Sequence, residues 1–239
     1  MTSRKFGIYA LHPIMYQTPI FKELQEYISN NSIEIEVKVC FGSDLSLKEY
    51  FYKEFQVFYK PNVPFLMDGY NYKFLKNLAR DPRSGFFSRV NFGIFREIKR
   101  EKYDVILIHG YDTFSAWLVL LAAKIYGARI IFRGESVLRG NENSFLPKQL
   151  FKKLIVSFFL KNCDAVMFSC TGNKNFLLKY GAQPNKLFPI PCAVNNDFFQ
   201  KEADIYSSQK IEIKSELGIP EGNLVLLFSA RFTERKCPM

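Results

Sequence analysis

The chain has 239 residues, 48% of them hydrophobic, which is enough for one large domain or for one domain and part of another. Its 33 Lys and Arg against 23 Asp and Glu give a net charge of +10, which favours phosphate-bearing partners such as nucleotides or anionic lipids. No block of basic residues and no aromatic-basic motif occurs, so nucleic acid is not expected as a partner. The five cysteines are scattered and form no CxxC pair, which favours a reduced cytosolic compartment and argues against a metal site.

The first ninety residues open as a β-α-β unit. Strands are predicted at residues 6–11 and 33–40, with a helix at about 19–30 between them. Residues 41–91 are rich in aromatic and turn residues without a steady period, and they predict one or two helices and a long excursion over the sheet. Such an excursion is commonly a lid or binding loop, and an ordinary packed insertion is an equal alternative. A basic amphipathic helix is predicted at 92–102.

Residues 103–136 are expected to form the centre of the domain. An apolar strand at 105–108 leads to a helix, with Asp112 or Thr113 as its N-cap, that ends at Gly127, and a second apolar strand follows at 130–132. Strands that are apolar on both faces belong to parallel sheets covered by helices. The predicted fold class is therefore α/β, a parallel sheet with helices on both faces. Polar residues follow each of these two strands, and they are expected side by side at the rim of a ligand crevice.

A helix at 147–161 carries one broad apolar face and several lysines. It is either a surface helix attracted to anionic lipid or a helix that covers the sheet, and the second interpretation is favoured because a doubly wound sheet needs such a face. Further strands are predicted at 164–169 and 187–191, a polar linker at 200–222 and a buried strand at 224–229. The predicted sheet-facing residues of the helix are Leu150, Phe151, Leu154, Ile155, Phe158 and Phe159.

Five segments, in the right order, carry a family resemblance. They are HPIMYQTPIFKEL, VPFLMDGYNYKFLKN, IFRGES, KYGAQPNKLFPIPCAVNNDFF and LVLLFSARFTERK. Together they resemble the amino-terminal half of a family-4 (group 1) glycosyltransferase of the GT-B fold. The resemblance implies an acceptor-binding Rossmann-like domain at 1–199, an interdomain linker at 200–222 and, at 223–239, the start of a second Rossmann-like domain that binds a nucleotide sugar and is truncated here.

The resemblance also implies an activity. It is the transfer of a sugar from a nucleotide-sugar donor to a saccharide or lipid-linked acceptor, with retention of configuration, in cell-surface polysaccharide or glycolipid biosynthesis. The enzyme would be of the hexosyltransferase type. No metal or other cofactor is expected, since fixed cations, helix N-termini and backbone N–H groups can stabilise the departing diphosphate. Arg231 and Lys236 are the expected donor-phosphate-binding residues.

The acceptor is expected in the crevice of the first domain. Arg133, Glu135 and Ser136 would orient the acceptor hydroxyl or the donor sugar, and an equal alternative is a buried Arg–Glu pair that holds the loop. A lone histidine at a strand end is more often structural, but His109 could hydrogen-bond the acceptor. The predicted catalytic residues are Glu135, Arg133 and His109, and the predicted acceptor-binding residues are His12, Tyr16, Gln17, Ser136, Asn173 and Asn175.

Two departures from the family pattern limit these expectations. Cys237 stands where relatives have a glycine, and the chain ends before the paired-glutamate motif. The chain alone is therefore expected to be inactive. The alternative function is a non-catalytic acceptor- or membrane-binding domain that works with a separate donor-binding subunit. The expected location is cytoplasmic, with a peripheral contact to anionic lipid at the inner face of the cytoplasmic membrane.

Overall fold

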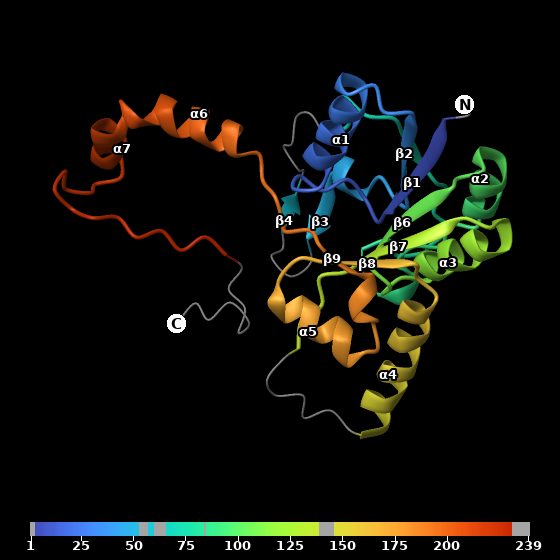
Figure 1. Cartoon of the computed structure of the whole chain (residues 1–239). Helices are drawn as coiled ribbons and strands as arrows, with labels where there is room; N and C mark the ends of the chain where they lie inside the picture. The colour runs from blue at the N-terminus through green and yellow to red at the C-terminus, as the bar shows by residue number, and fades with distance from the viewer. Residues whose placement is uncertain (1–2, 53–56, 60–65, 84, 139–145, 231–239) are drawn as a thin grey trace. The chain divides into compact units, whose positions relative to one another are not determined.

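The computed structural model describes residues 3–52, 57–59, 66–83, 85–138 and 146–230 (Figure 1). The chain divides into two units, residues 1–194 and 195–239, and each is described on its own. The first unit is built on a seven-stranded sheet in which every neighbouring pair is parallel, in the order β5-β2-β1-β6-β7-β8-β9. The strands are β1 (Arg4–Ala10), β2 (Ile35–Phe41), β5 (Tyr72–Phe74), β6 (Val105–His109), β7 (Arg129–Arg133), β8 (Ala165–Phe168) and β9 (Leu187–Pro189).

Helices cover both faces of this sheet. On one face, Phe21 and Ile28 of α1 pack on Ile8, Val37 and Leu107. On the other face, a larger apolar cluster joins the strands to the remaining helices of the unit. The α/β fold class predicted from the sequence is confirmed. The helices are α1 (Thr18–Asn30), α2 (Gly93–Glu101), α3 (Phe114–Tyr126), α4 (Leu146–Lys161) and α5 (Thr171–Lys179).

The central β6-α3-β7 unit has the predicted form. Thr113 is the N-cap residue of α3 with extended backbone, and Gly127 ends the helix at φ +79°, a left-handed conformation that glycine adopts without strain. β6 and β7 pair in parallel, with His109 opposite Arg133. The two polar loops that follow these strands therefore begin side by side.

Residues 41–91 differ from the prediction. Their described part contains no α-helix: it forms a 3₁₀ turn at Leu45–Leu47, a hairpin of β3 (Tyr50–Tyr52) with β4 (Val57–Tyr59), the sheet strand β5, and a second 3₁₀ turn at Phe86–Ser88. Aromatic residues favour strands over helices, and this segment is rich in them, which is consistent with the difference. Asn91 ties the segment to the sheet, because its side chain donates to the carbonyls of Gly42 and Lys76 and accepts from Tyr9. The described part is thus a packed insertion.

The side of α4 that faces the core was predicted wrongly. The core-facing residues are Val156, Phe159 and Leu160, and the ring of Phe159 lies 5.3 Å from that of Phe132. The helix is apolar around most of its circumference, so its periodicity alone does not determine which side packs on the sheet. Of the residues predicted to face the sheet, Phe159 is buried, whereas Leu150, Phe151, Leu154 and Phe158 are between 58% and 66% exposed.

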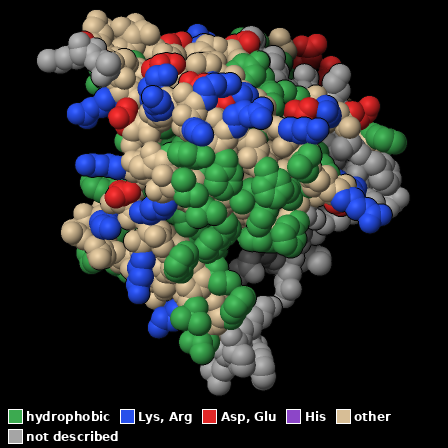
Figure 2. Space-filling model, turned by 90° about the vertical axis from the view of Figure 1, so that its right-hand side faces the viewer, with side chains coloured by type: hydrophobic (Ala, Val, Ile, Leu, Met, Phe, Trp, Pro, Cys, Tyr) green, Lys and Arg blue, Asp and Glu red, His purple; other side chains and the backbone are tan. Residues whose placement is uncertain are grey.

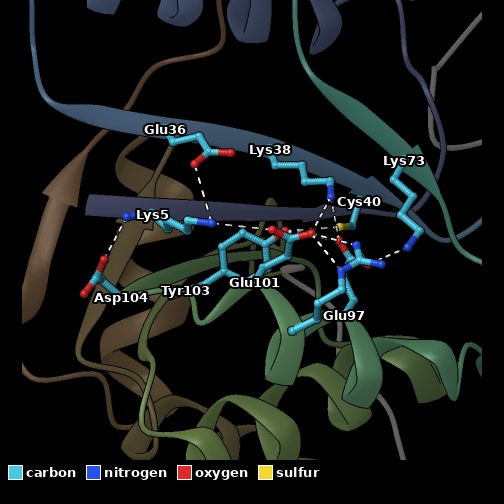
Figure 3. Close-up of polar contacts among 10 residues, drawn as sticks. Lys5, Glu36, Lys38, Cys40, Lys73, Glu97, Glu101, Tyr103 and Asp104 are labelled. Carbon is cyan, nitrogen blue, oxygen red and sulfur yellow. Dashed lines mark hydrogen bonds and ion pairs between the residues drawn. The ribbon is translucent and has the colours of Figure 1, made fainter. Parts of the chain in front are cut away.

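A network of charged side chains fastens α2 to the sheet (Figure 3). Glu97 of α2 has a side chain that is only 1% exposed, and its carboxylate lies 2.8 Å from Lys38 Nζ of β2 and 2.5 Å from Lys73 Nζ of β5. Lys38 also pairs with Glu101 at 2.9 Å, and the hydrogen bonds from Lys38 and Arg100 lower the pKa of Glu101 to about 2. One helix is thereby joined to two strands.

The second unit contains α6 (Asn196–Ser207) and α7 (Lys210–Glu216). The side chain of Asn195 caps α6 by accepting a hydrogen bond from the Phe198 amide. The predicted strand at 224–229 is not formed: Leu224, Leu226 and Leu227 are between 86% and 89% exposed. A strand needs a partner for its backbone groups, and the described residues of this unit offer none. Across the described parts of both units, no helix has the length and hydrophobicity that a membrane crossing requires.

Candidate active site

The carboxyl ends of the parallel strands form one edge of the sheet. Between β1 and β6 the strand order changes direction, since β2 and β5 lie on one side and β7 to β9 on the other. In open α/β sheets such a switch point is where a ligand crevice forms. The loops after β6 and β7 lie beside it, and the amide of Gly110 donates to the Arg133 carbonyl at 2.8 Å. The predicted juxtaposition of these two loops is confirmed.

Arg133 is the central cation of this edge. Its side chain is 4% exposed, and Nη2 lies 3.9 Å from Glu135 Oε1 and 3.9 Å from Cys192 Sγ. Its Nε has no hydrogen-bond partner among the described residues. A buried N–H without a partner carries a free-energy cost that a ligand oxygen can relieve.

His109 lies beside Arg133 on the next strand and is also buried. Burial, followed by the positive charge of Arg133, lowers the pKa of His109 to about 3. The imidazole is therefore neutral at physiological pH and acts as a hydrogen-bonding group without charge. Its Nε2 has no partner in the part of the chain that the structure describes, so it too can bind a ligand.

Tyr16 and Glu135 complete the group from two different loops. Tyr16, in the loop after β1, is partly exposed, and its partial burial raises its pKa, with Glu135 and Cys192 raising it further. The phenol is thus a proton donor at neutral pH. Glu135 has a side chain that is 45% exposed, and its carboxylate is held only loosely by Arg133. The four side chains offer a cation, a carboxylate, a phenol and a neutral imidazole, which suits a ligand rich in hydroxyl groups.

Asn173 holds the loop after β7 in place. It is fully buried, its Nδ2 donates to the Ser136 carbonyl at 2.7 Å, and its Oδ1 accepts from the Ser169 amide at 3.1 Å. These bonds make it a positioning residue rather than an exposed ligand-binding group. Gly134 fits tightly in the same loop, because a Cβ there would lie 2.6 Å from Cζ of Phe132.

The other predicted site residues lie apart from Arg133 or outside the description. His12 is half-buried and hydrogen-bonds Ser46 Oγ through Nδ1, so it contacts the turn after β2, and burial lowers its pKa. Gln17 is buried at the start of α1, and Asn175 is exposed on α5. Arg231 and Lys236 lie outside the described residues.

Sequence reasoning missed two residues at this edge. Cys192 follows β9, and the rule that parallel strands end at one edge could have placed it beside Arg133. Arg89 is buried, and it donates to the Leu11 carbonyl at 3.1 Å and to the Ser88 carbonyl at 2.9 Å. It thereby braces the loop that carries Tyr16. In the described ranges, no three His, Cys, Asp or Glu side chains gather as a metal site would require.

The low pKa of His109 predicts a specific dependence of stability on pH. The native state keeps this imidazole neutral, whereas the unfolded chain binds a proton below the ordinary pKa of 6.5. The stability that the neutral imidazole of His109 gives the native state is therefore fully present above pH 6.5, and it is lost as the pH falls toward 3. Between pH 7 and pH 5, His109 should lower the free energy of unfolding by about 2 kcal/mol. Urea denaturation of the wild type and of His109→Gln at several pH values measures this difference.

His12 is the only other histidine of the chain and is tested in the same way. Its pKa is also lowered by burial, so His12→Gln should remove a further part of the slope in the same direction. An unchanged pH slope in His109→Gln would show that the imidazole is not buried in solution.

Comparisons with known proteins agree with this architecture. The model of Glycosyltransferase Family 4 matches residues 36–198. A glycosyltransferase from Rickettsia africae is similar in structure, with a TM-score of 0.59 and 16% identity over 98% of this chain and 54% of that chain. HepE from Anabaena, solved in complex with UDP and glucose, has a TM-score of 0.52 and 11% identity over 90% of this chain and 50% of that chain. No curated protein matches the sequence.

At these identities the two structures show the fold alone, and this chain spans about half the length of each. The family match is independent of them and covers more than half of the chain. It includes both loops of the candidate site, after β6 and after β7. The chain therefore belongs to Glycosyltransferase Family 4 and has the Rossmann-like architecture of a GT-B glycosyltransferase.

Proposed function

We propose that this chain is the acceptor-binding domain of a glycosyltransferase that moves a sugar from a nucleotide-sugar donor to a saccharide or lipid-linked acceptor. The product would be a cell-surface polysaccharide or glycolipid. The observation that carries the proposal is the polar group around Arg133, which lies beside the switch point of the sheet within the segment that matches the family. HepE was solved with UDP and glucose bound. By analogy, we propose that this protein also uses a nucleotide-sugar donor.

The acceptor hydroxyl is proposed to bind between Glu135, His109 and Tyr16. Glu135 is the group best suited to accept its proton or to orient it, because the carboxylate is half exposed. His109 offers Nε2 as a neutral hydrogen-bonding group, and the phenol of Tyr16 donates. Arg133 would bind an acceptor or donor oxygen through its unpartnered Nε. General acid–base help of this kind contributes about 10²-fold to 10⁴-fold to a rate.

The contacts favour this role over a purely structural Arg133–Glu135 pair. An ion pair at 3.9 Å with one half-exposed partner contributes little to stability. The loop is already held by the Asn173 bond to Ser136 and by the Gly110 bond to Arg133. Glu135 is therefore left available to a ligand.

The donor side of the proposal concerns the whole protein. The diphosphate would be stabilised by Arg231 and Lys236 without a metal, and the transferred sugar would retain its configuration. A lipid-linked acceptor and the net charge of +10 favour a cytoplasmic enzyme at the inner face of the membrane.

Sugar transfer to lipid tests the proposal. The whole protein, purified from its source, is incubated with a membrane lipid extract of that source and a panel of labelled nucleotide sugars, and one sugar should enter the lipid fraction. Arg231→Ala should raise the KM for that donor at least about tenfold. Lys201→Ala, an exposed cation of α6, is the matched control and should leave the KM unchanged.

Two results would count against the proposed glycosyltransferase function. Transfer that appears only after a second protein fraction is added would favour a domain that works with a separate donor-binding subunit. Saturable acceptor binding without transfer under either condition would show a non-catalytic protein.

A further inference from the structure

Two helices of the first unit present an apolar surface to solvent. α3 contributes a row of exposed residues, and α4 contributes a second row on the side opposite its buried face. Figure 2 shows hydrophobic side chains gathered into one broad area on this face of the molecule. The α3–α4 apolar surface consists of Leu121, Ile125, Leu150, Phe151, Leu154 and Phe158, which are between 51% and 66% exposed.

The two rows meet at Trp117. Its ring stacks on Phe158 with the centroids 6.2 Å apart and an interplanar angle of 12°, and it lies edge-on to Phe159 at 5.0 Å. The Trp117 Nε1 donates to the Tyr111 carbonyl at 2.9 Å, which fixes the ring. The surface is therefore continuous across both helices and held by packed aromatic rings.

Such a surface needs a covering. A helix that is apolar on both sides is normally buried on both sides, and α4 is buried only along Val156, Phe159 and Leu160. Single exposed apolar residues are ordinary on protein surfaces, but adjacent ones over two helices mark an interaction site.

The charges beside this surface indicate what covers it. The helical residues of α3 and α4 include no Asp or Glu, and lysine is their only charged residue. Lys124, Lys153 and Lys161 are exposed. Apolar and aromatic side chains with adjacent lysines and no acidic groups are the composition of a helix surface that lies in the interface of an anionic membrane.

We propose that the α3–α4 apolar surface docks on a bilayer that contains anionic lipids. Leu154, Phe151 and Phe158 would enter the boundary between headgroups and acyl chains, and the lysines would meet the headgroup phosphates. This inference rests on the proposed membrane location and adds the surface that makes the contact.

A second copy of the chain fits this surface less well. A two-fold contact places the same patch of both copies face to face, so the lysines of α3 and α4 from both copies would share one interface in which these helices supply no acidic partner. Like charges at close range oppose such a contact, whereas anionic headgroups neutralise them.

Co-sedimentation with vesicles tests the docking surface. The wild type is mixed, without any sugar donor, with vesicles of phosphatidylcholine and phosphatidylglycerol and with vesicles of phosphatidylcholine alone. Leu154→Glu is compared with Tyr27→Glu on α1, because the two side chains are 62% and 61% exposed and the charge change is the same. The partition coefficient should fall at least about tenfold in Leu154→Glu and change less than about twofold in Tyr27→Glu. The wild type should bind the anionic vesicles more tightly.

Three outcomes would overturn the proposal: a wild type that binds neither vesicle, a Leu154→Glu variant that binds like the wild type, or a wild-type dimer in light scattering that Leu154→Glu converts to monomer without any vesicle binding. Because no donor is present, failure of vesicle binding leaves the transfer test standing. Failure of transfer with intact vesicle binding would reject the enzymatic proposal alone.

Discussion

Replacing Glu97 with glutamine is expected to lower the free energy of unfolding by about 3 kcal/mol, because it removes the carboxylate that pairs with Lys73 and leaves Lys38 with Glu101 alone. Urea denaturation of the purified variant at neutral pH measures the loss. Glutamine keeps the size of the side chain, so the effect reports the charge and its hydrogen bonds rather than a cavity.

The size of this effect follows from the burial of the carboxylate. Burial alone raises the pKa of Glu97, but the hydrogen bonds and charges of Lys38 and Lys73 outweigh it and lower the pKa below the ordinary glutamate value. Arg100 adds a contact at 2.9 Å from the next turn of the helix. The carboxylate therefore stays ionised in a place where an unpaired charge would be costly.

Glu36 supplies the control from the same network (Figure 3). It is half exposed and lies 3.6 Å from Lys5 Nζ, and Glu36→Gln should change the free energy of unfolding by less than about 0.5 kcal/mol. If Glu97→Gln were as mild as Glu36→Gln, the network would not hold α2 to the sheet.

The central unit could be predicted because its signals are local. Apolar strands such as Val105–His109 and Arg129–Arg133, together with a glycine at the helix end, specify a β-α-β crossover within about thirty residues. The same logic placed His109 beside Arg133, since parallel strands end at one edge. Hydrophobic periodicity and turn chemistry suffice where one element packs on its neighbours in the chain.

The core-facing side of α4 and the burial of Glu97 could not be predicted from the sequence, because both depend on contacts between distant segments. Nothing within α4 distinguishes the side with Leu154 from the side with Val156, because both are apolar and the choice depends on Phe132 of a distant strand. The burial of Glu97 likewise depends on Lys38 and Lys73, which belong to separate strands. A pattern within one segment cannot show such contacts.

The sequence predicts at which edge of the sheet the candidate site lies, but it does not predict every residue that reaches this edge or the hydrogen bonds made there. The strand-end rule gave Arg133, Glu135 and His109, but Cys192 and Arg89 reach the same edge through loops whose paths the sequence does not determine. Asn173 was placed at the correct edge, whereas its fully satisfied amide could be seen only in the structure.

Replacing Glu135 with glutamine is expected to lower kcat for sugar transfer by about 10²-fold to 10³-fold, because it removes the carboxylate that accepts or orients the acceptor proton. The side chain is half exposed and its contact with Arg133 is 3.9 Å long, so the free energy of unfolding should change by less than about 1 kcal/mol. Steady-state kinetics of transfer, together with urea denaturation of the same preparation, measure both quantities.

The two measurements separate the alternatives for the Arg133–Glu135 pair. A pair that only holds the loop would lose stability in Glu135→Gln while kcat falls little, which is the opposite pattern. Glu23→Gln, an exposed carboxylate of α1, is the matched control and should leave both quantities unchanged. A normal kcat in Glu135→Gln would show that Glu135 is not the group that accepts or orients the acceptor proton. A large loss of kcat with full stability would assign the half-exposed carboxylate at the end of β7 to the acceptor.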